Sequence, residues 1–267
     1  MVDQSLVELS LAQRMKGYED VETKKRFPKT KPVYVRLDGR GFSKFTKHMK
    51  KPYDEKMSEL MIDVTKYLVK ETGAVMGYTQ SDEISLVWYA DENRQNIFFD
   101  GRVQKILSNV TSLCTARFLY GAIKNWPDLC DRKLPTFDCR GISMPDFGEA
   151  SNMLLYRSMD AYKNSISMAA HSVFGHKKLQ KVNGQQKIEM LKEAGVDFEA
   201  YPDFFKFGTF VRSEKFVVGV DDPNIPVEFR GDGTCIRSRV VEVDVGQLVD
   251  VKNRVRFIFH GEKPEKE

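Results

Sequence analysis

The sequence predicts an α+β fold with an antiparallel sheet at its centre. Four short runs of apolar and β-branched residues have the composition of strands: 33–38, 74–79, 84–89 and 136–144. Apolar residues recur at helical spacing between the first two runs and again between the last two. The resulting order β-α-β-β-α-β is that of the ferredoxin-like unit, whose helices cover one face of the sheet.

The first half of the chain divides into elements with recognisable ends. A helical stretch at 6–27 precedes the turn-rich segment 28–32, which contains two prolines. The helix predicted at 54–72 has Gly73 as its C-terminal stop. A second long helix is predicted at 96–123.

The second half has a different character. Helical patterns occupy 150–174 and 184–194, and Gly195 follows the second of them. Short strands are expected between 207 and 259, with a hairpin turn at Gly231-Asp-Gly233. This part is predicted to form an α/β C-terminal lobe.

The change after Pro145 predicts two domains. We expect a catalytic domain with an N-terminal helix at 1–147 and a lobe of helices and short strands, packed on it, at 148–267.

Composition sets only broad limits on function. The 267 residues are 41% hydrophobic, enough for a sizeable core, and the net charge of +4 permits nucleic-acid binding without demonstrating it. We expect no membrane partner, because no uncharged run approaches the roughly 20 residues of a membrane span and the N-terminus lacks a secretory pattern. The four cysteines show no metal-binding spacing, which favours reduced thiols in a cytoplasmic protein.

Two carboxylates 44 residues apart carry the strongest functional signal. Asp38 lies at the end of a predicted strand that breaks at Gly39 and Gly41, and Asp82 lies at the tip of the predicted hairpin. A sheet can bring two such positions together, and Mg²⁺ in phosphoryl-transfer sites is typically held by one or two carboxylates and substrate phosphates. The sequence therefore predicts a site for Mg²⁺ and a nucleoside triphosphate.

Basic residues follow Asp38 closely. Arg40, Lys44 and Lys51 can provide positive charge for a triphosphate, and the glycines allow a close approach of the backbone. The alternative interpretation is an ordinary turn with a solvated basic loop, since charge runs usually face water.

The same segments resemble a known family. Arg36-Leu-Asp-Gly-Arg-Gly-Phe42 and Gln80-Ser-Asp-Glu83 look like the two signature segments of the tRNA-His guanylyltransferase superfamily, whose members add nucleotides to RNA in the 3′-to-5′ direction. Lys51-Pro-Tyr-Asp54 and Arg14-Met-Lys-Gly-Tyr-Glu19 are similar to further family elements. The resemblance implies that the sheet is a polymerase-palm sheet and that the protein is a metal-dependent nucleotidyltransferase.

The resemblance also implies roles for individual residues. Asp38 and Asp82 would be catalytic, and two Mg²⁺ ions would be held by Asp38, Gly39, Asp82 and Glu83. ATP or GTP would be bound by Arg36, Arg40, Gly41, Phe42, Ser43, Lys44, Lys51, Ser81 and Lys105. RNA contacts are expected from Lys163, Asn164, Lys177 and Lys178. Family members hold tRNA across subunits, which implies a homotetramer.

One departure from the family pattern concerns the choice of tRNA. The segment Tyr162-Lys-Asn-Ser-Ile-Ser-Met168 stands where tRNA-His guanylyltransferases carry His-Ile-Asn-Asn-Leu-Tyr-Asn, whose His helps to recognise the anticodon. This difference points to the branch called Thg1-like proteins, which repair truncated tRNA by template-dependent addition to the 5′ end. The alternatives are a tRNA-His guanylyltransferase that adds G at position −1, a tRNA-binding protein without catalysis, and a nucleotidyl cyclase with a similar palm.

Overall fold

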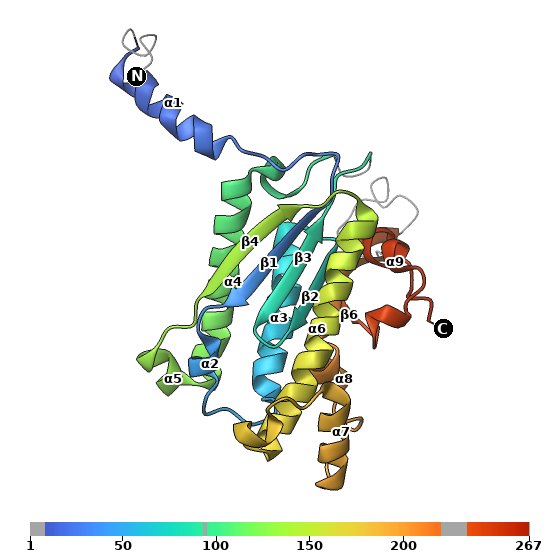
Figure 1. Cartoon of the computed structure of the whole chain (residues 1–267). Coiled ribbons are helices and arrows are strands. Elements are labelled where there is room, and N and C mark those ends of the chain that lie inside the picture. Colours follow the sequence, from blue (N-terminus) through green and yellow to red (C-terminus); the bar gives the residue numbers. More distant parts are fainter. Residues whose placement is uncertain (1–8, 93–94, 220–233, 267) are drawn as a thin grey trace.

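A computed structural model of the chain describes residues 9–92, 95–219 and 234–266 (Figure 1). The helices and strands follow one another as α1 (Leu11–Thr23), β1 (Val33–Gly39), α2 (Phe42–Phe45), α3 (Glu55–Thr72), β2 (Met76–Gln80), β3 (Glu83–Trp88), α4 (Val103–Asn125), α5 (Pro127–Arg132), β4 (Phe137–Ser143), α6 (Phe147–Val173), α7 (Gly184–Glu193), α8 (Asp203–Lys206), β5 (Thr209–Gly219), β6 (Thr234–Val243) and α9 (Arg254–His260).

The strands form one sheet in the order β4-β1-β3-β2-β5-β6, with antiparallel neighbours throughout. The first four strands of this order make up the ferredoxin-like unit that the sequence predicts, so the predicted fold class is confirmed. β5 then pairs with β2 through Gly77, Tyr78 and Thr79. The sheet is therefore continuous across residue 148, and the division into two domains there stays a prediction.

The alternation of side chains along β1 explains how the sheet is buried. Val33, Val35 and Leu37 belong to the core beneath the sheet, whereas Tyr34 belongs to a second core on the opposite face. Arg36 and Asp38 share the face of Tyr34 because successive strand side chains alternate. The catalytic candidate Asp38 is thus placed on the face opposite the larger core.

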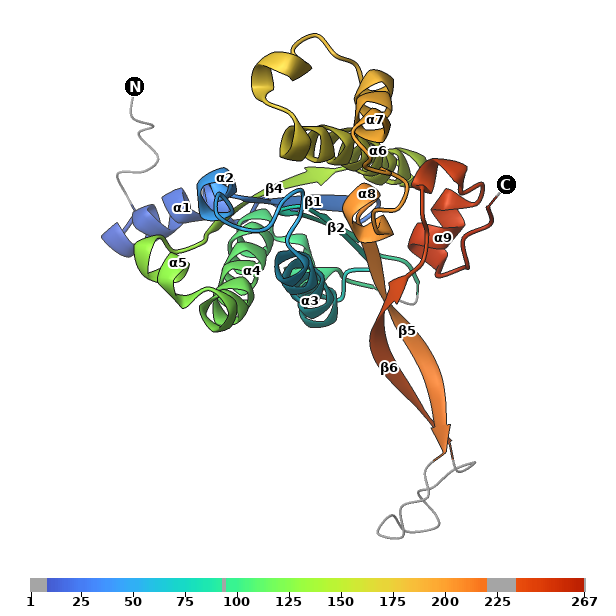
Figure 2. The ribbon, with the colours of Figure 1, turned by 90° about the horizontal axis from the view of Figure 1, so that it is seen from below.

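Helices cover both faces of the sheet: the two helices of the ferredoxin-like unit lie on one face, as predicted, and helices of the C-terminal half lie on the other. Figure 2 shows α3 and α4 on one side of the sheet and α6 on the other. The first core joins the sheet to α3 and α4, with Leu68, Val64 and Phe118 fully buried. The second core joins it to α6 and α9, with Leu154 and Phe257 fully buried. On its side, α6 leaves β4 and the end of β1 uncovered (Figure 1), so Arg36 and Asp38 are half-buried while Tyr34 is buried.

Local signals in the sequence set the ends of the helices. α3 begins after Asp54, whose side chain accepts a hydrogen bond from the Met57 amide, and ends at Gly73 in the left-handed region. α4 begins at Val103, later than the predicted residue 96, because Phe99, Asp100 and Gly101 all have positive φ. α1 is shorter than predicted: it begins after a capping box at Ser10 and ends at Thr23.

Two features extend from the body of the protein. α1 has no buried residue and projects away from the sheet (Figure 1). β5 and β6 form a long two-stranded ribbon (Figure 2), and the predicted turn at Gly231-Asp-Gly233 lies outside the described residues. In the described part of the chain, no helix is long and apolar enough to cross a membrane.

Candidate active site

The structure brings the two predicted carboxylates together. Asp38 is the penultimate residue of β1, and Asp82 lies in the two-residue turn between β2 and β3. The Gly39 amide donates a 3.0 Å hydrogen bond to the backbone oxygen of Asp82, which ties the turn to the end of β1. Ser81 occupies the first turn position with φ of 50°, a conformation that favours glycine. Its hydroxyl donates to the Asp82 carboxylate at 3.2 Å.

Gly39 leaves no room for a side chain between these elements. A Cβ atom at Gly39 would lie 2.5 Å from the Phe42 ring and 2.8 Å from Oδ2 of Asp82. The ring of Phe42 is buried and packs against Phe118 and Phe137, so it cannot move aside easily. The absence of a side chain at Gly39 therefore allows Asp82 to lie against the end of β1.

The electrostatics of the pair follow from this closeness. Burial, and next the carboxylate of Asp38, raise the pKa of Asp82 from 3.8 to about 6. Two neighbouring carboxylates repel each other when both are ionised, and a divalent cation would relieve that repulsion. Oxygen donors are the ligands that Mg²⁺ takes, so Asp38, Asp82 and the backbone carbonyl of Gly39 fit the predicted metal site chemically.

A cleft opens beside Asp82 between the hairpin turn, the loop after β1, and the helices α6 and α8. Its volume is about 290 Å³, at the lower end of the range for small-molecule pockets. The predicted site residues that line it are Phe42, Ser43, Lys51, Ser81, Asp82 and Asn164. Phe42 is 3% exposed and contributes chiefly to the core, whereas Ser43, Lys51 and Ser81 are exposed.

The other basic residues predicted for nucleotide binding lie outside the lining of this cleft. Arg36 is on the uncovered face of β1, while Arg40 and Lys44 are exposed on the loop that follows. Gly41 caps α2 with φ of 65°, and its carbonyl oxygen accepts a 3.3 Å hydrogen bond from Lys133. No sequence pattern points to Lys133, because 92 residues separate it from Gly41.

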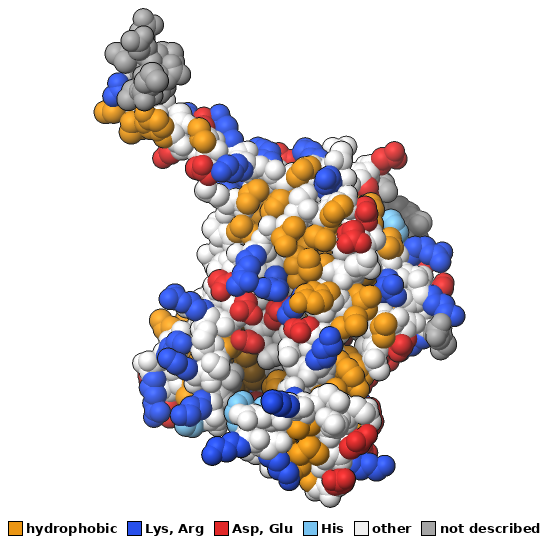
Figure 3. All heavy atoms as spheres, in the orientation of Figure 1, with side chains coloured by type: hydrophobic (Ala, Val, Ile, Leu, Met, Phe, Trp, Pro, Cys, Tyr) orange, Lys and Arg blue, Asp and Glu red, His pale blue; other side chains and the backbone are white. Residues whose placement is uncertain are grey.

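Register across the sheet adds two charged residues that the sequence alone does not indicate. Asp138 of β4 is directly opposite Asp38, and Arg140 is directly opposite Arg36. Directly opposed residues share a face and have Cβ atoms about 5 Å apart. Figure 3 shows the resulting acidic and basic side chains in the middle of the face over β1 and β4, beneath a band of hydrophobic side chains.

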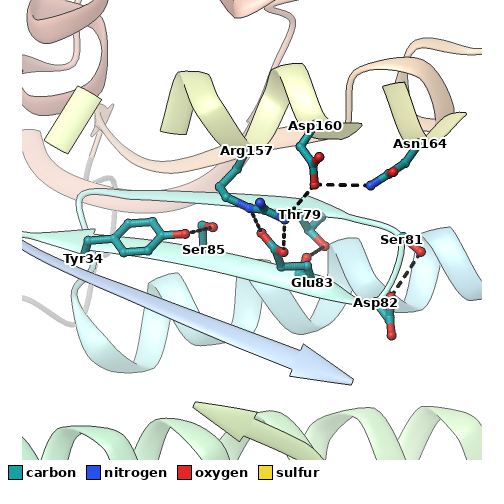
Figure 4. A network of polar contacts seen from close by, with 9 residues as sticks. All are labelled: Tyr34, Thr79, Ser81, Asp82, Glu83, Ser85, Arg157, Asp160 and Asn164. Carbon is teal, nitrogen blue, oxygen red and sulfur yellow. Dashed lines mark hydrogen bonds and ion pairs between the residues drawn. The ribbon is translucent and has the colours of Figure 1, made fainter. Parts of the chain in front are cut away.

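Glu83 fits the predicted role of metal ligand poorly. Both of its carboxylate oxygens accept hydrogen bonds from Arg157 of α6, at 2.7 and 2.5 Å, and its side chain is turned toward α6 rather than toward Asp82 (Figure 4). Glu83 and Arg157 are 5% and 7% exposed. Their pairing joins residues 74 positions apart and could not be read from the sequence.

Lys105 lies far from the carboxylates within one chain. It is on the first turn of α4, and Phe118, which packs on Phe42, follows 13 positions later. At 1.5 Å per residue this separation is about 20 Å. Lys105 lies over the ring of Phe99 and lines a hollow with Arg26 and Arg102 instead.

The four residues predicted to bind RNA do not form one group. Asn164 lines the cleft, while the neighbouring Lys163 lines a different hollow beside Phe207. Lys177 and Lys178 are exposed on the 3-10 helix at 176–179, with Lys178 over the Phe174 ring. Their predicted contacts with RNA stay predictions.

Comparison with known families settles which family contains this arrangement. A family model described as "Thg1: tRNAHis guanylyltransferase" matches residues 12–145, half of the chain, from α1 through β4. The chain belongs to the tRNAHis guanylyltransferase family. The matched segment contains Asp38, Gly39 and Asp82. The match therefore confirms the predicted superfamily. Because guanylyltransferases are nucleotidyltransferases, it also supports the predicted class of enzyme.

Relatives with curated sequences are moderately similar. An uncharacterised protein of Acanthamoeba polyphaga mimivirus is 32% identical over 202 residues, which are 67% of this chain and 69% of that protein. The tRNA(His) guanylyltransferase of Schizosaccharomyces pombe is 33% identical over 140 residues. That match covers 50% of this chain and 51% of the yeast protein, so the chain spans about half the length of this relative.

Solved structures of family members have the same fold. A bacterial tRNA(His) guanylyltransferase (Thg1)-like protein in complex with ATP matches with a TM-score of 0.71 and 35% identity, over 76% of this chain and 88% of that one. A bacterial Thg1-like protein in complex with GTP matches with a TM-score of 0.70 and 29% identity, over 93% of this chain and 97% of that one. The tRNA(His) guanylyltransferase from Saccharomyces cerevisiae matches with a TM-score of 0.64 and 25% identity, over 73% and 91%.

Proposed function

We propose that this family member adds nucleotides to the 5′ end of truncated tRNA, in the 3′-to-5′ direction and against a template base. The observation that carries the proposal is the convergence of Asp38, Gly39 and Asp82 beside a cleft lined by Lys51, Ser43 and Ser81. The similarity to Thg1-like proteins that bind ATP or GTP supports the choice of nucleoside triphosphates as substrates.

In the proposed reaction, ATP first activates a 5′-monophosphate end by adenylylation, with release of pyrophosphate. The 3′-hydroxyl of an incoming nucleotide then attacks the activated 5′ phosphate and expels AMP. With a 5′-triphosphate end, the same attack releases pyrophosphate directly. No protein nucleophile is needed, and the chain's part is to bind and align the two substrates.

Different residues of the site would bind the nucleotide, the RNA end and the metal ions. Lys51, Ser43 and Ser81 line the cleft, and we expect them to contact the activating nucleotide. Arg36 and Arg140, side by side on the uncovered face, supply positive charge for the phosphates of the RNA end. Asp38, Asp82 and the Gly39 carbonyl would hold two Mg²⁺ ions. When bound, these ions lower the pKa of the attacking hydroxyl and stabilise negative charge on the leaving phosphate.

The departure at Tyr162 favours repair over His-specific addition, because no histidine stands at the position associated with anticodon recognition. The second candidate function is G addition at position −1 of tRNA-His, which needs the same site.

To test the proposal, truncated transcripts of several tRNAs are incubated with each nucleotide in turn. Incorporation that follows the template base supports repair, and addition of G to tRNA-His alone supports the second candidate.

The assembly and location of the protein belong to the same proposal. We expect a homotetramer, since the family resemblance implies that tRNA is held across subunits. We also expect a cytoplasmic location, which the pattern of the four cysteines favours. Light scattering coupled to size exclusion measures the mass, and a monomer at micromolar concentration would contradict the expectation.

A further inference from the structure

A buried ion pair lies directly behind the turn that carries Asp82. Arg157 of α6 donates from Nε to Oε1 of Glu83 at 2.7 Å and from Nη2 to Oε2 at 2.5 Å. Thr79 of β2 donates its hydroxyl to the Glu83 backbone oxygen at 2.9 Å and braces the same residue from the other strand. Because Glu83 follows Asp82 in the chain, a guanidinium that fixes Glu83 also fixes the base of the turn (Figure 4).

The same guanidinium has a second partner on α6. Nη2 of Arg157 lies 3.2 Å from Oδ2 of Asp160, one turn along the helix. Oδ2 of Asp160 in turn accepts a 3.3 Å hydrogen bond from Nδ2 of Asn164. Asn164 lines the cleft, so the chain of contacts runs from the turn of Asp82 to the cleft wall (Figure 4).

Asn164 is an exposed residue of the cleft wall, and only one end of its side-chain amide has a partner among the described residues. Its amide nitrogen is engaged by Asp160, and within the described part of the chain no group donates to its Oδ1. A side-chain amide held in this way offers an acceptor to a donor group of a nucleotide. If the contact from Asp160 is lost, the amide is free to rotate.

A buried ion pair is weak evidence for stability alone, because the desolvation of both charges offsets their attraction. Its geometry is nevertheless specific, because a bidentate Arg–carboxylate pair fixes both distance and orientation. Arg157 is thus suited to holding two parts of a site in one geometry.

We propose that Arg157 is a positioning residue that couples the metal-binding turn to the nucleotide-binding wall, through Glu83 on one side and Asp160 with Asn164 on the other. The inference rests on the proposed function for its catalytic readout, and on ATP binding for a readout that is independent of it. The two arms have separable effects. The Glu83 arm acts on the alignment of Asp82, and the Asp160 arm acts on the affinity for nucleotide.

The test compares Asp160→Ala and Arg157→Lys with the wild type. Asp160→Ala keeps the Arg157–Glu83 pair and removes the acceptor that holds the Asn164 amide, so ATP affinity falls about tenfold while kcat at saturating ATP changes less than about twofold. Arg157→Lys keeps the charge but cannot make the bidentate contact, so kcat falls by about 10- to 100-fold. ATP affinity is measured by calorimetry and kcat by nucleotide addition to truncated tRNA.

A matched control is available in the same fold. Arg117 of α4 makes a bidentate pair with Asp63 of α3, at 2.8 and 2.9 Å, away from the cleft. Arg117→Lys removes the same kind of contact and leaves both ATP affinity and kcat within about twofold of the wild type.

The outcomes separate this inference from the proposed function. Wild-type values of ATP affinity and kcat in both folded variants would show that the pair is structural only, and would overturn the inference. If Arg157→Lys does not fold, Asp160→Ala alone decides through ATP affinity. A wild type that binds ATP but adds no nucleotide would contradict the proposed function. The inference then still stands if Asp160→Ala weakens ATP binding.

Discussion

Gly39 and Asp82 approach each other so closely that a Cβ atom on Gly39 would lie 2.8 Å from the Asp82 carboxylate. Gly39→Ala therefore has to displace Asp82, Phe42, or both. We expect nucleotide addition to fall by about 100-fold, since small misplacements of catalytic groups are costly. Steady-state rates on truncated tRNA measure the effect.

Gly17 provides the control for that substitution. It lies on α1, and no atom lies within 4 Å of the position that a Cβ atom would take there, so Gly17→Ala meets no steric barrier. This variant retains wild-type rates and gains up to about 1 kcal/mol of helix stability. Equal losses of activity in the two variants would contradict the steric argument at Gly39.

The raised pKa of Asp82 predicts that its ionised carboxylate lowers the free energy of unfolding of the protein. The folded-state pKa of about 6 exceeds the ordinary value of 3.8, so folding disfavours the ionised form. The free energy of unfolding of the wild type should fall relative to that of Asp82→Asn as the pH rises from about 4 to about 6, and the difference should then stay constant. It amounts to at most about 3 kcal/mol at 1.36 kcal/mol per pKa unit.

Urea unfolding of both proteins in EDTA, at pH 5 and pH 8, checks this prediction. Asp82→Asn should be the more stable protein at pH 8 although it is inactive. If the two proteins differed in stability by the same amount at both pH values, the surroundings of Asp82 would not disfavour its ionised form.

Mg²⁺ should stabilise the folded protein through the two carboxylates. A ligand that binds only the native state adds RT ln(1 + [L]/Kd), which is about 2.7 kcal/mol at a concentration 100 times Kd. We expect Mg²⁺ to raise the Tm of the wild type but not that of Asp38→Asn or Asp82→Asn. Asp131→Asn, at an exposed position on α5, should respond like the wild type. An equal response in all four proteins would point to Mg²⁺ binding elsewhere.

Two lysines of one loop should differ in their effect on nucleotide binding. Lys51 lines the cleft, whereas Lys47 of the same loop does not. Lys51→Ala should weaken ATP binding by roughly tenfold, the value of one charge-assisted hydrogen bond, and Lys47→Ala by less than about twofold. Calorimetric titration with ATP measures both, and equal effects would indicate only a general attraction of the basic loop.

The features predicted best from the sequence are those that residues close together in the chain determine. The hairpin with Asp82 at its tip, the strand that ends near Asp38, and the helix stop at Gly73 all follow from short-range patterns, and the structure contains each of them. The sequence also predicted that the two carboxylates lie close together, because the end of a strand and the tip of an adjacent hairpin can meet at the same edge of a sheet.

Long-range pairing could not be read from the sequence. The predicted ferredoxin-like order already makes β4 a neighbour of β1, but not the register that places Asp138 opposite Asp38. The contact of Arg157 with Glu83 depends on how α6 packs over the sheet, and the sequence predicts only that the C-terminal lobe packs on the first domain. The start of α4 was predicted too early, since helical periodicity does not report the positive φ angles of Phe99 and Asp100.

The most direct test of the central claim is the incorporation of labelled GTP into a tRNA transcript that lacks its first nucleotide, in the presence of Mg²⁺. The wild type is compared with Asp38→Ala and Asp82→Ala on 5′-monophosphate and 5′-triphosphate ends. The account predicts addition opposite the template base by the wild type and none by either variant. A folded, RNA-bound wild type that adds nothing to either end, or a variant that retains the activity, would contradict it.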